Sequence, residues 1–190
     1  EAVIDSIDSK KTSFVKLQLI EKQEKPAFQI HLYVAPTKQM ERIEWMVEKC
    51  CEFGIHTIGF FVSKNSERKE MKLNRLEKIA IAALKQSKNL FLPKIQALAP
   101  LKQVMDTIKL DPNDQALFAH ISDPPVLTLG KQIGLNKSYY LFIGPEGDFS
   151  SEETTNMLKN NFTPFSLGKA ILRTETACIA TTHAIHLAHE

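Results

Sequence analysis

The sequence predicts an α/β protein whose sheet is mostly parallel and is covered by helices on both faces. From residue 28 onward, short apolar runs that are typical of strands alternate with longer segments in which apolar residues recur at helical spacing. Runs such as "IGFFV" at 58–62 contain no polar residue, so a strand formed by them would be apolar on both of its faces. This is typical of strands in a parallel sheet that is buried on both faces. The 43% hydrophobic content of the 190 residues is enough for the core that such a domain needs.

Residues 1–24 stand outside this alternation. "FVKLQLI" at 14–20 is predicted as a strand, the polar turn "EKQEKP" at 21–26 follows it, and strand-like sequence begins close to the first residue. We therefore expect residues 1–24 to be the C-terminal part of a preceding β-rich domain, and the α/β domain to occupy residues 25–190. Because the first residue is Glu, we also expect the true N-terminus to be missing.

The first half of the α/β domain is predicted as strand, helix, strand and helix. "FQIHLYV" at 28–34 and "IHTIGFFV" at 55–62 are strands, and the helix between them is capped by Thr37 and stopped by Gly54. Four apolar residues of this helix recur at helical spacing: Met40, Ile43, Met46 and Val47. The second helix is "LNRLEKIAIAALKQSK" at 73–88, which ends before Pro93.

The second half repeats the alternation with shorter elements. In order, they are a strand near "KIQAL" at 94–98, a helix at about 101–109, the strands "QALFAHIS" at 115–122 and "SYYLFI" at 138–143, a helix from Ser151, a strand near "TPFSL" at 163–167 and a final helix from Thr174.

Composition excludes several classes of protein. The apolar runs are too short to span a bilayer and no signal segment opens the chain, so we expect a cytoplasmic protein with no membrane contact. Cys50, Cys51 and Cys178 cannot make a disulfide framework, which fits a reducing compartment. The net charge of +2 does not indicate a nucleic-acid binder, and the basic segment 64–78 is either a solvated surface or a phosphate-facing patch.

A rigid turn follows the strand at 138–143, in the stretch "LFIGPEGDFSSEE". Gly144 and Gly147 permit close approach of the backbone to a ligand, Pro145 stiffens the turn, and Ser150 with Glu153 forms a capping box for the next helix. Ligands of open α/β sheets bind at such strand ends. The glycine spacing fits neither a dinucleotide-binding fingerprint nor a P-loop, and a plain strand-to-helix connection is the alternative.

A second loop, "SLGKAILRTETACIATTHAIHLA" at 166–188, has the same design of a glycine after a strand and hydroxyl groups at a helix start. Thr174 or Thr176 can cap the helix. Arg173 and Glu175 lie at its first turn, where they are either functional or a plain surface ion pair.

The two loops together resemble the signature pair of the RsmE family, which are SPOUT-class methyltransferases. "IGPEGDFSSEE" and "SLGKAILRTETA" carry the resemblance, and "KQMERIEWMVEKCCEFGIHTIGFF" and "RLEKIAIAALKQSKNLFLP" extend it over about residues 28–189. Enzymes of this family methylate N3 of a uridine in 16S ribosomal RNA of the small subunit and use S-adenosylmethionine as methyl donor. A SPOUT enzyme that methylates a ribose 2′-oxygen and a non-catalytic RNA-binding module are the alternatives.

The resemblance implies a fold and partners. It implies a SPOUT-type α/β knot, in which the C-terminal part forms a deep trefoil knot, preceded by the remnant of a PUA-like β-barrel. It also implies a homodimer in which the final helix packs against its partner, and the helix has a small-residue face for this contact: Ala177, Ala180, Ala184 and Ala188.

The resemblance also implies the site. Twelve residues are expected to bind S-adenosylmethionine: Ile143, Gly144, Pro145, Glu146, Gly147, Ser166, Leu167, Gly168, Ile171, Leu172, Thr176 and Ala177. Because uridine N3 carries a proton, we expect Arg173 to stabilise the negative charge on uracil, with Glu175 as a weak candidate for the base. No metal is expected, because His183, His186 and His189 are explained more simply as a polar helix end.

Three positions depart from the usual family pattern. Asp148 stands where a glycine is commoner, Lys169-Ala170 replace a frequent Pro-Arg pair, and Lys88-Asn89 follow Gln86-Ser87 where an arginine is usual. These departures affect the expected RNA contacts and leave the two donor loops intact.

Overall fold

The computed structural model describes residues 2–16, 26–135 and 138–190 of the chain. Eight strands are present in this part: β1 (Ala2–Ile7), β2 (Thr12–Lys16), β3 (Gln29–Val34), β4 (Thr57–Val62), β5 (Lys94–Pro100), β6 (Asp114–Ala119), β7 (Ser138–Ile143) and β8 (Thr163–Phe165). The helices are α1 (Met40–Glu52), α2 (Leu73–Ser87), α3 (Leu101–Thr107), α4 (Ser151–Lys159) and α5 (Thr174–Leu187), with one 3-10 turn, η1 (Leu129–Lys131).

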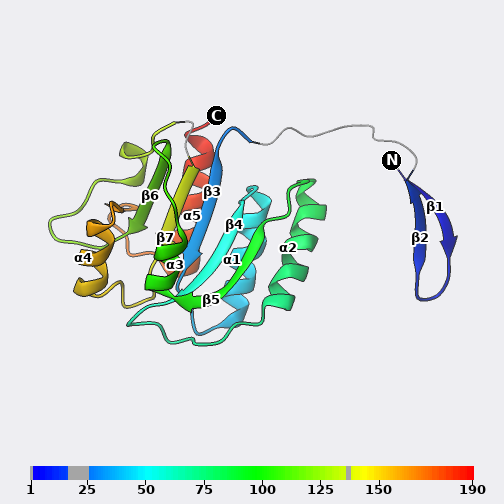
Figure 1. Cartoon of the computed structure of the whole chain (residues 1–190), viewed down its shortest axis with the longest axis horizontal. Helices are drawn as coiled ribbons and strands as arrows, with labels where there is room; N and C mark the ends of the chain where they lie inside the picture. Colours follow the sequence, from blue (N-terminus) through cyan, green and yellow to red (C-terminus); the bar gives the residue numbers. More distant parts are fainter. Residues whose placement is uncertain (1, 17–25, 136–137) are drawn as a thin grey trace.

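Strands β3 to β8 form one six-stranded sheet in the order β5-β4-β3-β7-β6-β8 (Figure 1). All neighbouring pairs in it are parallel, so the predicted α/β class with a parallel sheet is confirmed. Strand β7 lies between β3 and β6, although it follows both in the chain. The loops that leave β3, β6, β7 and β8 therefore meet at one edge of the sheet, where ligands of such folds bind.

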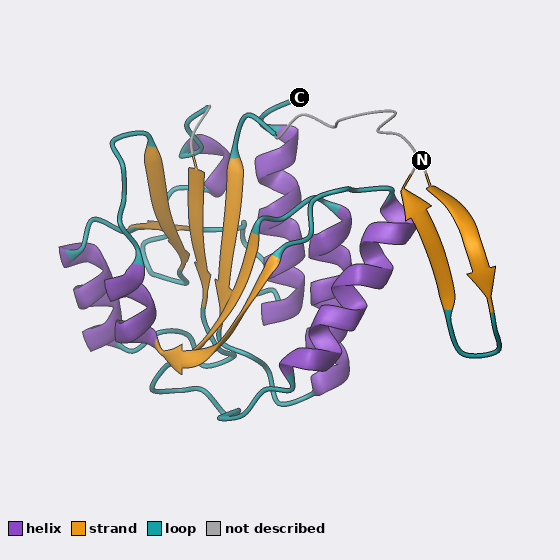
Figure 2. Ribbon diagram, turned by 45° about the vertical axis from the view of Figure 1, so that its right-hand side comes forward, coloured by secondary structure: helices purple, strands orange, loops and turns teal. Residues whose placement is uncertain are grey.

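The two faces of the sheet carry two separate hydrophobic clusters. Helices cover both faces of the sheet (Figure 2). Leu32 and Leu141 belong to the cluster with residues of α1, α2 and α5, whereas the adjacent Tyr33 and Phe142 belong to the cluster with residues of α3 and α4. The rings of Tyr33 and Phe142 stack with their centroids 4.8 Å apart. Successive residues of a strand point to opposite faces, and burial on both faces explains why the strands are apolar throughout.

Local sequence signals correctly predicted the N-terminal cap of α4 but not those of α1 and α5. The capping box at α4 is confirmed, because the Ser150 hydroxyl accepts a hydrogen bond from the Glu153 amide and the Glu153 carboxylate accepts one from the Ser150 amide. The predicted Thr37 cap is wrong. Helix α1 begins at Met40, and the Thr37 hydroxyl donates instead to the carbonyl of Gln39. Neither predicted threonine caps α5, whose N-cap residue is Arg173.

The N-terminal hairpin is a sheet of its own. Strands β1 and β2 pair antiparallel, and β2 covers the start of the predicted strand at 14–20. The rest of that strand, most of the turn at 21–26 and the proposed domain boundary at 24/25 lie outside the described residues. Apolar side chains of the hairpin are 48–70% exposed: Val3, Ile4, Ile7, Phe14 and Val15. None of the helices in the described part of the chain is long and apolar enough to cross a bilayer.

The three cysteines are buried, and we expect them to be chemically inert in the folded protein. Burial raises the pKa of Cys50 and of Cys51 to about 12, and it raises the pKa of Cys178 well above its usual value. The thiolate is the reactive form, so at pH 8 the folded protein should react with a thiol reagent at least a hundredfold more slowly than the protein in urea. Labelling followed by absorbance should give three equivalents only after unfolding, and rapid labelling of the native protein would contradict the burial.

Candidate functional site

A cavity of about 1060 Å³ lies at the carboxyl ends of the strands. Its size is at the upper end of the range for small-molecule sites. Four groups of residues form most of its walls: 37–42 from the β3–α1 connection into the first turn of α1, 119–128 from the end of β6 onward, 143–148 from the end of β7 onward and 165–177 from the end of β8 into α5. The two loops singled out in the sequence thus face one space, which no local sequence pattern could have shown.

Most of the residues expected to bind the methyl donor line this cavity. Ten of the twelve do so: Ile143, Gly144, Pro145, Glu146, Ser166, Leu167, Gly168, Ile171, Leu172 and Ala177. Arg173 lines it as well, and its side chain is exposed. Gly147, Thr176 and Glu175 do not line it.

The glycines of the turn after β7 make room for the protein's own side chains. A Cβ atom on Gly144 would lie 3.1 Å from the ring of Phe149, and one on Gly147 would lie 3.3 Å from Cβ of Asn65. These distances are tighter than ordinary van der Waals contact. The Thr174 hydroxyl donates a hydrogen bond of 3.2 Å to the Gly144 carbonyl, which fixes the turn to the first residue of α5.

Asp148, one of the residues that depart from the expected family pattern, connects the turn to the chain after β6. It has a φ of 57°, a conformation that Asp tolerates better than most residues. Its Oδ2 accepts a hydrogen bond from the Ile121 amide at 3.2 Å and lies 3.1 Å from Nδ1 of His120. His120 and Asp148 both line the cavity and were not predicted as site residues.

The loop after β8 is held by backbone pairing and by Ser166. The Ser166 hydroxyl accepts from the Gly168 amide and donates to the Gly168 carbonyl, both at 3.1 Å. Gly168 has a φ of 117°, which L side chains rarely adopt, and a Cβ atom built there would meet nothing within 4 Å. Ile171 is 79% exposed, so the loop offers an uncovered apolar side chain beside the cavity.

Arg42 is the main charged residue that the sequence did not indicate. Its Nη1 lies 3.5 Å from Glu175 and 3.9 Å from Glu146. Glu175 is 6% exposed, and its Oε2 is buried without a hydrogen-bond partner. Arg42 and not Arg173 therefore pairs with Glu175, and Arg173 forms no ion pair with a described residue. The only sequence feature that pointed to Arg42 was its position as a cation in the first turn of a helix that begins at the carboxyl edge of the sheet.

The histidines near the C-terminus pack against aromatic rings. His189 stacks on Phe28 with centroids 3.9 Å apart, and His183 stacks on Phe53 at 4.9 Å. His186 meets Phe28 edge-on, and burial lowers the pKa of His186. The residues that the structure describes contain no group of three or more His, Cys, Asp or Glu that could hold a metal ion.

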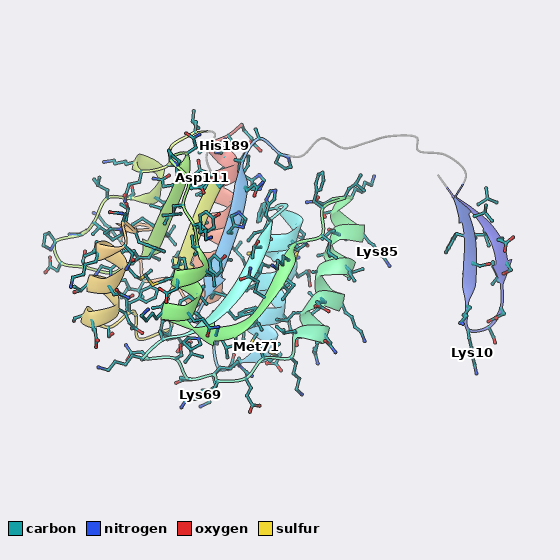
Figure 3. The ribbon with its side chains drawn as sticks, viewed as in Figure 1. Lys10, Lys69, Met71, Lys85, Asp111 and His189 are labelled. Atoms are coloured by element: carbon teal, nitrogen blue, oxygen red, sulfur yellow. The ribbon has the colours of Figure 1, made fainter. Side chains whose placement is uncertain are left out.

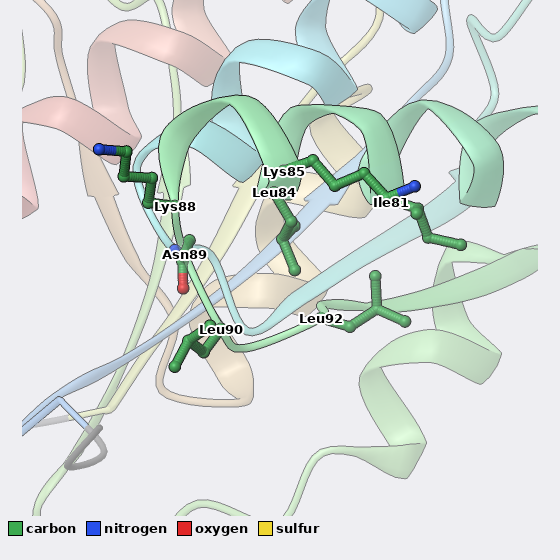
Figure 4. A pocket seen from close by; sticks show the side chains of 7 residues that line it. All are labelled: Ile81, Leu84, Lys85, Lys88, Asn89, Leu90 and Leu92. Atoms are coloured by element: carbon green, nitrogen blue, oxygen red, sulfur yellow. The ribbon is translucent and has the colours of Figure 1, made fainter. Parts of the chain in front are cut away.

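A smaller hollow of about 430 Å³ lies beside the C-terminal half of α2. Figure 4 shows its lining residues: Ile81, Leu84, Lys85, Lys88, Asn89, Leu90 and Leu92. It holds two lysines as its only charged groups and none of the predicted site residues. The larger cavity is therefore the candidate functional site.

Comparison with known proteins connects the cavity to a family. The sequence model of the protein family described as RNA methyltransferase domain matches residues 23–186. The ribosomal RNA small subunit methyltransferase E of Mesomycoplasma hyopneumoniae is 32% identical over 178 residues, which cover 86% of this chain and 73% of that protein. The protein of the same name from Buchnera aphidicola is 31% identical, and the match covers 82% of this chain and 62% of that protein.

Solved structures agree with the sequence relatives. A probable rRNA methyltransferase from Porphyromonas gingivalis is 35% identical, with a TM-score of 0.89 over 99% of this chain and 79% of that one. The ribosomal RNA small subunit methyltransferase E of Neisseria gonorrhoeae, bound to S-adenosylmethionine, is 26% identical, with a TM-score of 0.75 over 85% and 67%. The TrmH/SpoU enzyme of Aquifex aeolicus, at 13% identity and a TM-score of 0.58, shares the fold.

Sequence, fold and cavity agree with one another. The chain belongs to the RNA methyltransferase domain family and, within it, to the ribosomal RNA small subunit methyltransferase E (RsmE) family.

Proposed function

We propose that this protein methylates N3 of a uridine in 16S ribosomal RNA of the small subunit, with S-adenosylmethionine as methyl donor. The observation that carries the proposal is the convergence of the turn at 144–147 and the loop at 166–172 on one cavity, in a chain of the RsmE family. The donor supplies an electrophilic methyl group: the N3 proton leaves uracil, nitrogen bonds to the methyl carbon, and the carbon–sulfur bond breaks.

The residues of the cavity fit this donor. One part of its wall is apolar, as a flat purine requires, and it is formed by Ile143, Phe165, Leu167, Leu172 and Ala177. Glu146, His120 and Asp148 offer hydrogen-bonding groups for hydroxyl and ammonium groups. At Gly168 the space where a Cβ would stand is open, so a ligand can approach the backbone there.

Two charged residues are proposed to act on the uracil. Arg173 is a fixed cation at the start of α5, on the wall of the cavity, and it is proposed to stabilise the anion that uracil becomes when N3 loses its proton. Glu175 is the weaker candidate, for accepting that proton: its buried Oε2 has no hydrogen-bond partner, but its Oε1 is paired with Arg42. It does not line the cavity, so the contact with uracil is assigned first to Arg173.

Methyl transfer to ribosomal subunits tests this function. The protein is incubated with labelled S-adenosylmethionine and small subunits that lack the modification, and the labelled base is then mapped. A methyl group on N3 of one 16S uridine is the expected result. Label on a ribose 2′-oxygen would establish the other SPOUT activity, and donor binding without transfer to any subunit RNA would indicate an RNA-binding module.

The proposal includes a knotted C-terminal part and a separate N-terminal domain. The Ser166 amide donates to the Leu127 carbonyl and the Ser166 carbonyl accepts from the Leu129 amide, so the chain after β6 pairs in parallel with the start of the loop that leads into α5, and this close pairing of distant segments supports the proposed knot. The apolar, uncovered hairpin supports the proposal that residues 1–24 belong to a PUA-like β-domain. Pulling on both chain ends should leave a shortened contour length if the knot is present.

A homodimer is also proposed, with α5 at the contact. The alanine face predicted for it is partly used within the protomer, because Ala177 lies in the core and Ala184 packs against it. The exposed stripe of α5 consists of Thr176, His183 and Leu187. Light scattering at micromolar concentration should give twice the mass of one chain, and a monomer would refute the dimer.

A further inference from the structure

The segment between β4 and α2 touches two walls of the cavity at once. This segment, Ser63 to Arg68, is called the clasp below. It begins with a tight turn in which the Ser63 amide donates to the Ser66 hydroxyl at 2.9 Å. In Figure 3, Lys69 and Met71, which follow the clasp, lie at the edge where the strands end, and Asp111 and His189 lie at the opposite edge.

One end of the clasp holds the turn after β7. The side-chain amide of Asn65 donates one hydrogen bond to the Gly147 carbonyl and another to the Asp148 carbonyl, each at 3.0 Å. The Lys64 amide donates to Oε1 of Glu153 at 2.8 Å, while Oε2 of the same carboxylate caps α4. The turn is therefore fixed to the clasp in two ways: directly through the Gly147 and Asp148 carbonyls, and indirectly through Glu153 of the helix that follows the turn.

The other end of the clasp holds the segment between β3 and α1. Nε of Arg68 donates to the Thr37 carbonyl at 3.0 Å, and Nη2 of the same guanidinium donates to the Lys38 carbonyl. Thr37 and Lys38 line the cavity, and so does Glu67 of the clasp itself. The cavity walls at 37–38 and 147–148, which are about 110 residues apart in sequence, are thus joined by one segment.

We propose that the clasp sets the geometry of the donor site, with Asn65 and Arg68 as positioning residues that do not touch the reacting atoms. This inference rests on the proposed function and extends it to residues outside the two signature loops. A turn that is already held in its binding conformation loses less conformational freedom when a ligand binds, so its affinity for the ligand is higher. Asn65 is suited to this role because it offers two N–H groups to two neighbouring carbonyls.

Two variants of Asn65 and one control test the proposal. Asn65→Ala removes both hydrogen bonds, and Asn65→Asp keeps the shape but offers no N–H donor. Asn74→Ala is the matched control, because Asn74 is an exposed asparagine at the start of α2, outside the clasp and the cavity. Calorimetry with S-adenosylhomocysteine should show about tenfold weaker binding for both Asn65 variants and unchanged binding for the control.

Hydrogen exchange in the ligand-free protein gives a second readout that does not depend on the donor. The amides of residues 144–149 should exchange at least fivefold faster in Asn65→Ala than in the wild type, with no change in Asn74→Ala. Unchanged exchange in this turn, or a lowered melting temperature with wild-type donor affinity, would overturn the proposal. If the wild type binds no donor, the proposed function fails, and the exchange measurement still decides whether the clasp holds the turn.

Discussion

Arg173→Ala is expected to slow methyl transfer by about a hundredfold or more and to leave donor affinity nearly unchanged. A residue that stabilises charge only in the transition state contributes to the rate of the chemical step and little to ground-state binding. In the structure Arg173 lines the cavity, is exposed and has no carboxylate partner among the described residues. Its guanidinium is therefore available to a substrate. The alternative role of Arg173, an ion pair with Glu175, does not apply, because Glu175 pairs with Arg42.

Two further variants separate a specific contact from general attraction of RNA. Arg173→Lys should restore only part of the rate, because an ammonium group cannot reproduce the planar fork of the guanidinium. Lys169→Ala is the matched control, since Lys169 is another exposed cation on the wall of the same cavity. It should weaken RNA binding modestly and leave the rate at saturation within about threefold of the wild type.

Single-turnover kinetics at saturating donor and RNA measure the effect on the chemical step alone. Near-normal turnover in Arg173→Ala would leave this residue without a catalytic role, and the stabilising group would then have to be another cation on the wall, such as Arg42 or Lys38. An equal loss of rate in Lys169→Ala and Arg173→Ala would show that only the total charge matters.

Local patterns in the sequence were sufficient for the elements that depend on local physics. Buried strands such as β7 and the capping box of α4 were predicted with the observed start, because apolar runs and reciprocal side-chain–backbone bonds act over a few residues. The Thr37 cap failed because its hydroxyl has a competing partner, the Gln39 carbonyl. Strand order could not be derived from local patterns, since β7 enters between two strands formed earlier in the chain.

The same distinction applies to the site. Local residue patterns indicated the two loops, the family resemblance implied which of their residues bind the donor, and most of those residues line the cavity. The residues that hold the walls of the cavity in place were missed: Arg42, Asn65, Arg68 and His120. Each acts through a partner far away in sequence, and a single charged or amide side chain carries no local sign of that partner. The basic segment 64–78 shows this well, because Arg68 binds the carbonyl of Thr37 and Arg75 pairs with Glu44, although Arg75 is exposed, as Lys64, Lys69 and Lys72 are.

Gly168→Val is expected to weaken donor binding by a factor of about ten to a hundred. A Cβ atom at Gly168 would meet no protein atom within 4 Å, so the protein itself leaves room for a side chain there. The main obstacle to valine is the backbone conformation. A φ of 117° is nearly closed to a β-branched residue, and holding one there costs about 1–3 kcal/mol, which corresponds to about five- to a hundredfold in an equilibrium constant. The exposed loop relieves this strain by leaving the conformation that lines the cavity.

Gly130→Val is the matched control for this variant. Gly130 also has open space around its Cβ position, but it lies in η1 without a positive φ and does not line the cavity. Calorimetry with S-adenosylhomocysteine should show weakened binding for Gly168→Val and wild-type binding for Gly130→Val. Because the strain is relieved locally, the melting temperature of both variants should stay close to that of the wild type. Wild-type affinity in Gly168→Val would show that donor binding does not depend on the loop at 166–172, and the donor would then have to be assigned to the turn at 144–147 alone.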